Sequence, residues 1–264
     1  MTLELETAFR ACERLVAIAV AVQTIEMLVI RDALSGEGIW RWKSLSAEFG
    51  SIPKALSKIL ALALNYRGFI LVQILGLIAA LATQFFSSPV LLALMLTVTF
   101  LTCLRFRGTF NGGSDYMTIV VLSALTLGST LAAYSQAKSV ALAYIAIQLI
   151  LSYFIAGVVK LRNKRWRSGE ALRVFISSSI YNTPSSSARL STSKPLMLLA
   201  SWAIISFECL FPIALLNPQA AQFAVGIAIP FHIANVYFFG LNRFLWVWIA
   251  TYPALLFTSS LLAQ

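Results

Sequence analysis

The stretch that decides the fold runs from Lys138 to Lys160 and has the sequence KSVALAYIAIQLILSYFIAGVVK. No charged side chain lies between these two lysines, over a distance of 21 residues. A helix of about 20 apolar residues is long enough to cross the hydrocarbon core of a bilayer. This stretch therefore predicts a transmembrane helix.

The composition of the whole chain agrees with that prediction. The 264 residues are 59% hydrophobic and 11% charged, with a mean hydropathy of +0.83. A soluble domain carries about 25% charged residues, so we expect lipid to cover most of this surface. We predict an all-α fold, a polytopic transmembrane helix bundle of about eight spans in a single domain, 1–264. The expected spans are 11–30, 67–86, 88–106, 115–134, 138–160, 196–216, 219–240 and 243–262.

Two connecting segments are long. Residues 31–66 mix aromatic and basic side chains, with apolar residues at helical spacing around 54–64, which predicts a segment that lies in the membrane interface. Residues 161–195 begin with basic residues and end in a Ser-rich run, 181–187, which is typical of a flexible loop.

The distribution of basic residues predicts the orientation. Of the 20 Lys and Arg residues, 17 fall on one side of an eight-span bundle, and only Arg10, Arg14 and Lys138 fall on the other. The positive-inside rule then places the basic loops in the cytoplasm and both termini outside, in the plasma (inner) membrane. The net charge of +10 is explained by these loops, so the expected partner is the lipid bilayer and not nucleic acid.

Ionisable groups within apolar helices are costly, so each one is a candidate functional residue. Glu13 and Arg14 lie where a helix begins, which favours a structural role, and for Glu26 both snorkelling and function stay open. Asp115 begins a predicted span. Glu208 lies in the middle of a span, where function and helix–helix bonding are equally compatible with the sequence.

His232 is the only histidine, and Asn235 follows three residues later on the same helical face. A single histidine without a cluster of Cys, Asp or Glu argues against a zinc or haem site. The three cysteines are far apart and show no metal-ligand spacing, so we expect no metal.

Lys160 allows two interpretations. A basic residue commonly flanks a span, but Arg165 and Arg167 already supply that anchor. Ala156 and Gly157 leave room on the face that carries Lys160, and a lysine held in an apolar pocket can act as a base.

The segment around Lys160 resembles a known family. YFIAGVVKL at 153–161, followed by Trp166 and Gly169, resembles the hallmark segment of vitamin K-dependent γ-glutamyl carboxylases. It is also similar to their bacterial relatives, the HTTM (horizontally transferred transmembrane domain) proteins. Two further matches are the FH-x-x-N pattern at 231–235, which leads into a closely spaced final helix with Tyr252-Pro253, and NGGSDY at 111–116. The resemblance covers about residues 100–255.

The resemblance implies a chemistry for these residues. In the carboxylases, the lysine that matches Lys160 deprotonates vitamin K hydroquinone, oxygen adds, and the resulting base removes a proton from a peptide glutamate that then captures carbon dioxide. Lys160 and His232 are the implied catalytic residues, with a reduced quinone as cofactor. The candidate residues for binding the cofactor are Asn235, Tyr153, Asp115 and Glu208. Where the carboxylases carry an important histidine, this chain has GGSD at 112–115.

Two functions follow from the resemblance and stay open. The first is a carboxylase-like or other quinone-dependent enzyme that modifies a peptide or a small molecule. The second is a non-catalytic membrane partner in the maturation or export of a small peptide or toxin, acting with an accessory membrane protein. A transporter is disfavoured because the sequence shows no inverted repeat.

Overall fold

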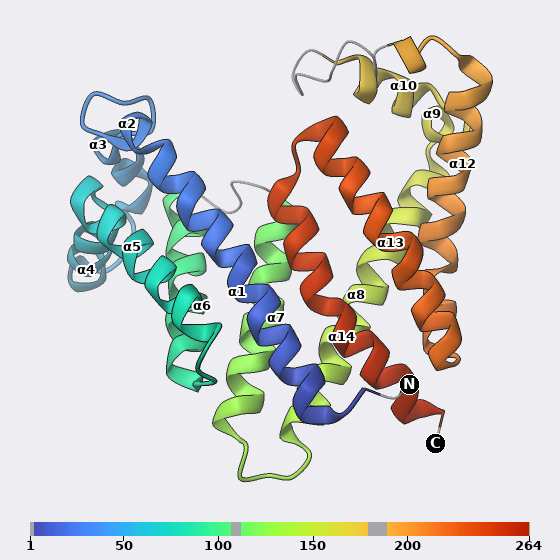
Figure 1. Ribbon diagram of the computed structural model, residues 1–264. Helices are drawn as coiled ribbons and strands as arrows, with labels where there is room; N and C mark the ends of the chain where they lie inside the picture. The colour runs from blue at the N-terminus through green and yellow to red at the C-terminus, as the bar shows by residue number, and fades with distance from the viewer. Residues whose placement is uncertain (1–2, 107–111, 179–188, 264) are drawn as a thin grey trace. The chain divides into compact units, whose positions relative to one another are not determined.

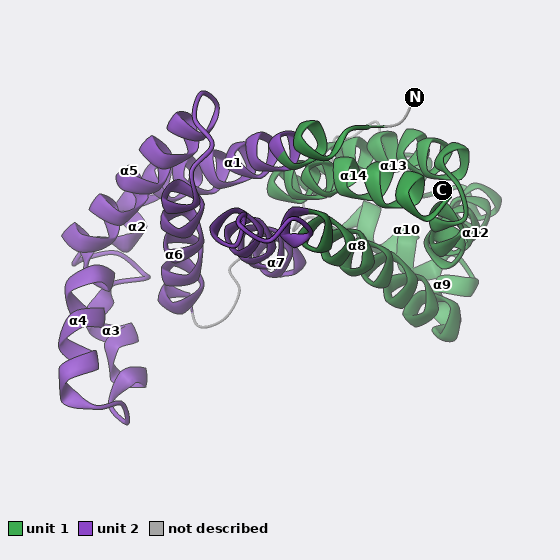
Figure 2. Cartoon of the chain, turned by 90° about the horizontal axis from the view of Figure 1, so that it is seen from below, with its two compact units in different colours: residues 1–9, 139–264 green, residues 10–138 purple. Residues whose placement is uncertain are grey.

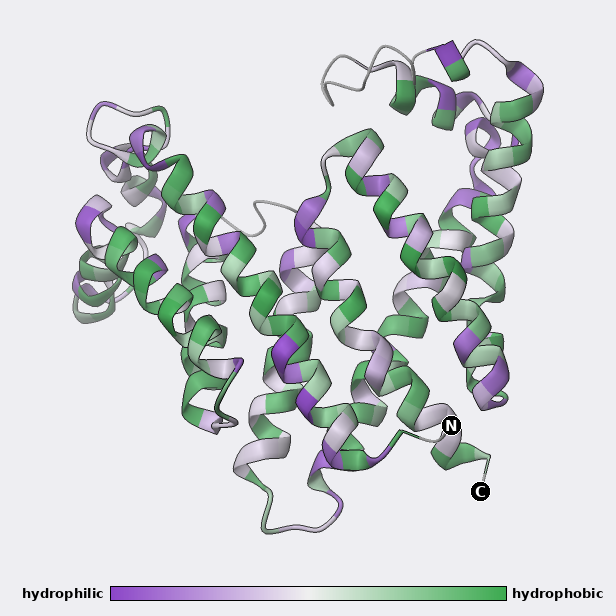
Figure 3. Cartoon of the chain, viewed as in Figure 1, coloured by the Kyte–Doolittle hydropathy of each residue, from purple (hydrophilic) through white to green (hydrophobic). Residues whose placement is uncertain are grey.

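The computed structural model describes residues 3–106, 112–178 and 189–263. Within these ranges the chain forms helices joined by turns, which confirms the predicted all-α polytopic fold (Figure 1). The long helices are mainly hydrophobic, whereas hydrophilic residues concentrate in the shorter connecting helices (Figure 3). The Ser-rich run at 181–187 and Asn111 lie outside the described residues.

The chain divides into two compact units (Figure 2). Unit 1 consists of Met1–Phe9 with Ser139–Gln264, and unit 2 of Arg10–Lys138. The long helices of unit 2 are α1 (Leu5–Val29, whose first turn belongs to unit 1), α5 (Tyr66–Thr83), α6 (Pro89–Arg105) and α7 (Gly113–Thr130). Its short helices are α2 (Arg31–Leu34), α3 (Trp42–Leu45), η1 (Ser46–Phe49) and α4 (Lys54–Leu64). Unit 1 contains α8 (Ala137–Arg162, which belongs to it from Ser139), α9 (Lys164–Arg167), α10 (Glu170–Ser177), α12 (Lys194–Leu210), η3 (Phe211–Leu215), α13 (Pro218–Phe239) and α14 (Asn242–Leu262).

All eight predicted spans are helices, but the predicted number of spans is too high. Among the described residues, five helices are long and apolar enough to cross a membrane: α5, α8, α12 with η3, α13 and α14. The other three fall short for different reasons. α6 has only 17 residues, α1 carries Arg10, Glu13, Arg14 and Glu26, and α7 opens with the polar residues Gly113, Ser114 and Asp115.

Capping residues fix the short joints between neighbouring helices. The Asn217 side chain accepts a hydrogen bond from the backbone N–H of Ala220, and Pro218 follows as the first residue of α13. Pro is favoured there because its missing N–H would be unsatisfied in any case. α13 ends at Phe239, and the capping residue Gly240 that follows has a left-handed φ of 66°, which suits a residue without a side chain. These joints turn the chain back on itself, so α12, α13 and α14 follow one another within unit 1.

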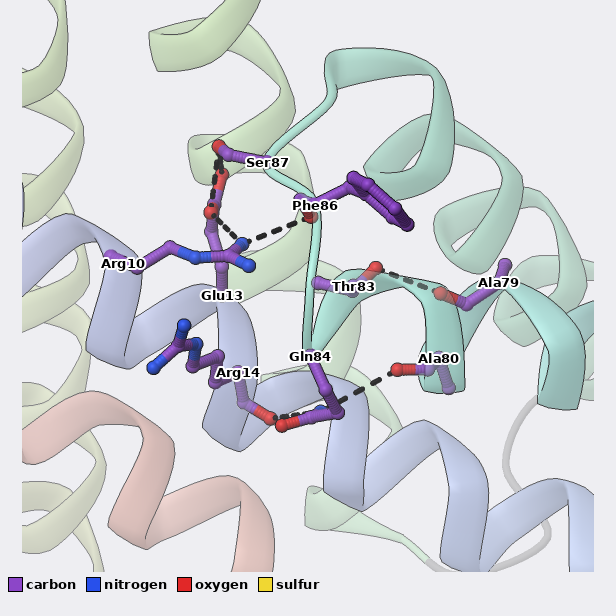
Figure 4. A network of polar contacts seen from close by, with 9 residues as sticks. All are labelled: Arg10, Glu13, Arg14, Ala79, Ala80, Thr83, Gln84, Phe86 and Ser87. Atoms are coloured by element: carbon purple, nitrogen blue, oxygen red, sulfur yellow. Dashed lines mark hydrogen bonds and ion pairs between the residues drawn. The ribbon is translucent and has the colours of Figure 1, made fainter.

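A buried carboxylate in unit 2 attaches the turn between α5 and α6 to α1 (Figure 4). Glu13 accepts hydrogen bonds from Arg10 at 2.8 Å and from the Ser87 hydroxyl at 2.8 and 2.9 Å. The Gln84 side chain donates to the backbone carbonyl of Arg14 at 3.1 Å. Glu13 is fully buried in these contacts, and Arg14 contributes through its backbone.

Both long connecting segments contain short helices. In residues 31–66, α4 forms where the apolar spacing at 54–64 predicts a helix. Leu64 and Leu34 from this segment pack with Met27 and Phe69 in a buried cluster. In residues 161–195, α9 and α10 follow α8 and pack near α12 through Leu172, Ile176 and Met197.

Candidate functional site

The first part of the candidate site is an ion pair between α8 and α12. Lys160 Nζ donates to Glu208 Oε1 at 2.8 Å and to Oε2 at 2.7 Å. The Lys160 side chain is 19% exposed and that of Glu208 is 5% exposed. Lys160, in the last turn of α8, is therefore not a free amine, because its ammonium group is held against a buried carboxylate.

A glycine brings the two helices close enough for this pairing. A Cβ atom added to Gly157 would lie 2.7 Å from the backbone nitrogen of Cys209 and 2.9 Å from its Sγ. Cβ atoms do not approach other atoms so closely, so residue 157 must lack a side chain for α8 to contact α12 here. The sequence predicts room beside Lys160, and the backbone of α12 next to Glu208 occupies that room.

Trp166 on α9 covers the other side of the lysine. Lys160 Nζ lies 5.3 Å from the centroid of the Trp166 ring, within the range of a cation–π interaction. The Ser201 hydroxyl donates to the Trp166 carbonyl, which holds α9 against α12. Gly169, with a φ of 74°, makes the turn from α9 to α10, where a side chain would meet the backbone of Leu198. Trp166 and Gly169 thus shape the surroundings of Lys160.

The second part of the site is a chain of three buried side chains. The Tyr153 hydroxyl lies 2.6 Å from His232 Nε2 and 3.1 Å from the Tyr252 hydroxyl. Tyr153 belongs to α8, His232 to α13 and Tyr252 to α14. Tyr153 precedes Lys160 by seven residues, which is about two helical turns, so both side chains lie on one face of α8.

Aromatic rings surround both parts. Phe211 stacks on Tyr153 with ring centroids 3.9 Å apart, and Phe207, the neighbour of Glu208, contacts Tyr153 edge-on. Phe244 and Trp248 stack on each other at 3.9 Å, and the centroid of each lies within 6 Å of that of His232. These rings bury the polar groups in an apolar setting, where unpaired polar atoms are costly.

The remaining predicted residues lie elsewhere. Asn235 is half-buried one turn after His232, and within the described residues no hydrogen bond joins their side chains. Asp115 is buried in the first turn of α7, in unit 2. The sequence did not single out Tyr252 as a site residue. A phenol within an apolar helix needs a hydrogen-bond partner, and this signal could have drawn attention to it.

The arrangement suits proton transfer. A lysine–carboxylate pair and a tyrosine–tyrosine–histidine chain both allow a proton to pass between atoms less than 3.2 Å apart. In the part of the chain that the structure describes, no group of three His, Cys, Asp or Glu residues is placed to hold a metal ion.

Comparison with known protein families identifies a domain in this chain. Residues 116–260 match the HTTM domain, and they include every residue of the ion pair and of the tyrosine–histidine chain. No curated protein and no solved structure matches the chain. Since the match covers more than half of the 264 residues, this membrane protein belongs to the HTTM domain family.

Proposed function

We propose that this chain is a membrane enzyme in which the Lys160–Glu208 pair accepts a proton from a reduced quinone, so that a peptide or a small molecule is modified. The observation that carries this proposal is the pair itself, with Nζ–O distances of 2.7 and 2.8 Å inside the matched domain. The carboxylases that the sequence resembles use a lysine at the matching position for this purpose, and carboxylation of a glutamate side chain is the reaction that the resemblance implies.

The pair can supply a base without leaving a charge uncompensated. One proton that crosses from Lys160 Nζ to Glu208 converts the ion pair into an amine and a carboxylic acid, and the net charge of the pair stays zero. The amine can then accept a proton from a bound molecule. In this scheme Glu208 is a positioning residue that holds the lysine and stores the proton. A positioned acid–base group typically contributes about 10²–10⁴ to a rate.

The residues present fit a quinone in two respects. His232 Nδ1 is buried and has no hydrogen-bond partner among the described residues, so it is available to a ligand. Phe244 and Trp248 next to it provide aromatic faces for a planar ring. These three residues would hold the cofactor. When bound, a reduced quinone supplies an acidic hydroxyl and two reducing equivalents, which the protein itself lacks.

Oxygen uptake with menadiol as the reduced quinone tests this proposal. Purified protein in native-lipid nanodiscs should consume oxygen faster than protein-free nanodiscs, and the lipid extract should contain a quinone detectable by mass spectrometry. Lys160→Ala should lower the protein-dependent rate by about a hundredfold or more. The matched control is Lys164→Ala on α9, an exposed lysine that should leave the rate unchanged. Uptake no faster than without protein, or an unimpaired Lys160→Ala, would contradict the proposal.

The exposed surface of α13 favours the second candidate function, a non-catalytic partner of a small exported peptide. α13 is the least buried of the five helices that can span a membrane. Phe223, Ile227 and Tyr237 follow one another along one face and are all exposed. If this function holds, the export phenotype should fail in Phe223→Glu and survive in Lys160→Ala. The opposite pattern would favour the enzyme.

We further propose that the protein lies in the plasma membrane with its C-terminus outside. α9 and α10, which carry Arg165, Arg167 and Arg173, lie at the end of unit 1 opposite the end of α14 (Figure 1). Basic segments stay in the cytoplasm, which would place the C-terminus outside. The expectation that both termini lie outside belongs to eight spans, because five spans place the two ends of the chain on opposite sides.

Reporter fusions test this orientation. Alkaline phosphatase fused after Gln264 should be active, because it folds only outside the cytoplasm, and green fluorescent protein at the same position should be dark. A fluorescent fusion together with an inactive phosphatase would reverse the orientation.

A further inference from the structure

The hydrogen-bonded chain of Tyr252, Tyr153 and His232 has fewer protons than hydrogen-bonding sites. The possible positions of its protons can therefore be enumerated. Each tyrosine hydroxyl has one proton to donate, and a neutral imidazole has one N–H donor and one acceptor nitrogen. Two contacts join the three groups, Tyr252–Tyr153 at 3.1 Å and Tyr153–His232 Nε2 at 2.6 Å. No other side-chain hydrogen bond of these groups is formed with the described residues, and His232 Nδ1 has none.

Three arrangements satisfy both contacts. In the first, Tyr252 donates to Tyr153, Tyr153 donates to Nε2, and the histidine proton is on Nδ1. In the second, Nε2–H donates to Tyr153, which donates to Tyr252, so the Tyr252 proton and Nδ1 both lack partners. In the third, Nε2–H and Tyr252 both donate to Tyr153, so the Tyr153 proton and Nδ1 lack partners.

The first arrangement leaves one unsatisfied atom, Nδ1–H, and each of the others leaves two. Tyr153, His232 and Tyr252 are at most 3% exposed, so water does not readily compensate for an unpaired donor. A buried polar group without a partner costs about 1–3 kcal/mol, which favours the arrangement with the fewest of them. The hydrogen bonds therefore run in one direction, from Tyr252 through Tyr153 to His232.

From this direction we infer that His232 presents Nδ1–H as a hydrogen-bond donor, and that the ligand group facing it is an acceptor oxygen of a quinone or hydroquinone. Tyr153 is a positioning residue, because its hydroxyl donates its proton to Nε2 and thereby leaves the histidine proton on Nδ1. The inference rests on the proposed function for the identity of the ligand. The position of the proton on His232 rests only on the hydrogen-bond count.

Nitrogen NMR of isotope-labelled histidine tests the proton position. His232 is the only histidine in the chain, so labelled protein purified without a histidine tag gives the signals of this residue alone. We expect a protonated Nδ1 and an unprotonated Nε2 in lipid nanodiscs. A protonated Nε2, with or without a proton on Nδ1, would overturn the inference.

Tyr153→Phe tests the role of the hydroxyl that donates to Nε2. Without it, neither ring nitrogen of His232 has a hydrogen-bond partner among the described residues, so the spectrum should change to a mixture of both tautomers. The matched control is Tyr237→Phe, an exposed tyrosine on the same helix as His232, which should leave the spectrum unchanged. An unchanged spectrum in Tyr153→Phe would refute the positioning role.

Two ring-shaped probes test the ligand class. Menadione carries two carbonyl oxygens, and methylnaphthalene has a similar ring system without them. Menadione should shift the Nδ1 signal and methylnaphthalene should not. If neither probe shifts the Nδ1 signal, or if both probes shift it, His232 does not bind an acceptor oxygen. The proposed function is tested separately. If His232 Nδ1 is protonated but the protein shows no menadiol-dependent oxygen uptake, the proposed function is wrong while the proton position holds.

Discussion

At the scale of single residues, the Lys160–Glu208 pair has the largest energetic consequences. A buried ion pair adds little net stability, because removing two charges from water costs about as much as their attraction returns. Removing only one partner is costly, since the other charge stays buried and unpaired. Glu208 is almost fully buried, whereas Lys160 keeps some exposure and can move towards the headgroups.

A double-mutant cycle measures this coupling. Lys160→Met should lower the free energy of unfolding by about 3–5 kcal/mol, because it strands the Glu208 carboxylate. Glu208→Leu should cost less, since Lys160 can reach water. The double variant Lys160→Met/Glu208→Leu should recover most of the loss. Thermal unfolding in one detergent gives all four values, with Lys164→Met as an exposed control. If the loss in free energy of unfolding in the double variant equals the sum of the losses in the two single variants, the two side chains do not interact.

The sequence singled out both residues but not their pairing. Lys160 and Glu208 stood out because charge is rare within apolar helices. They are 48 residues apart, and a hydrophobic pattern does not specify which helix faces another or at what height. Tyr252 was not predicted as a site residue for the same reason, because its hydrogen bond is to Tyr153, 99 residues away.

At the scale of the helices, the contact between α8 and α12 depends on Gly157. The apolar pattern predicts both helices, and their bounds agree with it to within a few residues, as in Ala137–Arg162 for the predicted 138–160. Their close approach comes from a missing side chain, which the sequence predicts only as room on one face. Helix–helix contacts in membranes commonly use such small residues.

Gly157→Ala tests this contact. The new methyl group would clash with the backbone of Cys209, so we expect a loss of about 1–3 kcal/mol in stability. The matched control is Gly226→Ala on α13, where a Cβ meets nothing within 4 Å. Alanine is the better helix former, so the control should be neutral or more stable by up to about 1 kcal/mol. Equal effects of the two changes would argue against a close contact at Gly157.

At the scale of the whole molecule, composition predicts the all-α membrane class but not the number of spans. A window of apolar residues marks a helix whether or not that helix crosses the bilayer. α7 shows the difference, because it is a helix as predicted, but its first turn contains Ser114 and Asp115. The residues that carry the proposed chemistry all belong to unit 1 and to the matched domain, 116–260. They come from four helices, α8, α12, α13 and α14, so the site exists only when these helices pack together.

The central claim is that the Lys160–Glu208 pair performs proton transfer in a membrane enzyme. The most direct measurement is menadiol-dependent oxygen uptake by Lys160→Met/Glu208→Leu in lipid nanodiscs, because this variant should keep the fold and lose only the acid–base pair. We predict that its rate falls by about a hundredfold or more, to near the rate without protein, while its unfolding temperature stays close to that of the parent chain. A stable double variant that consumes oxygen at the parent rate would contradict the claim.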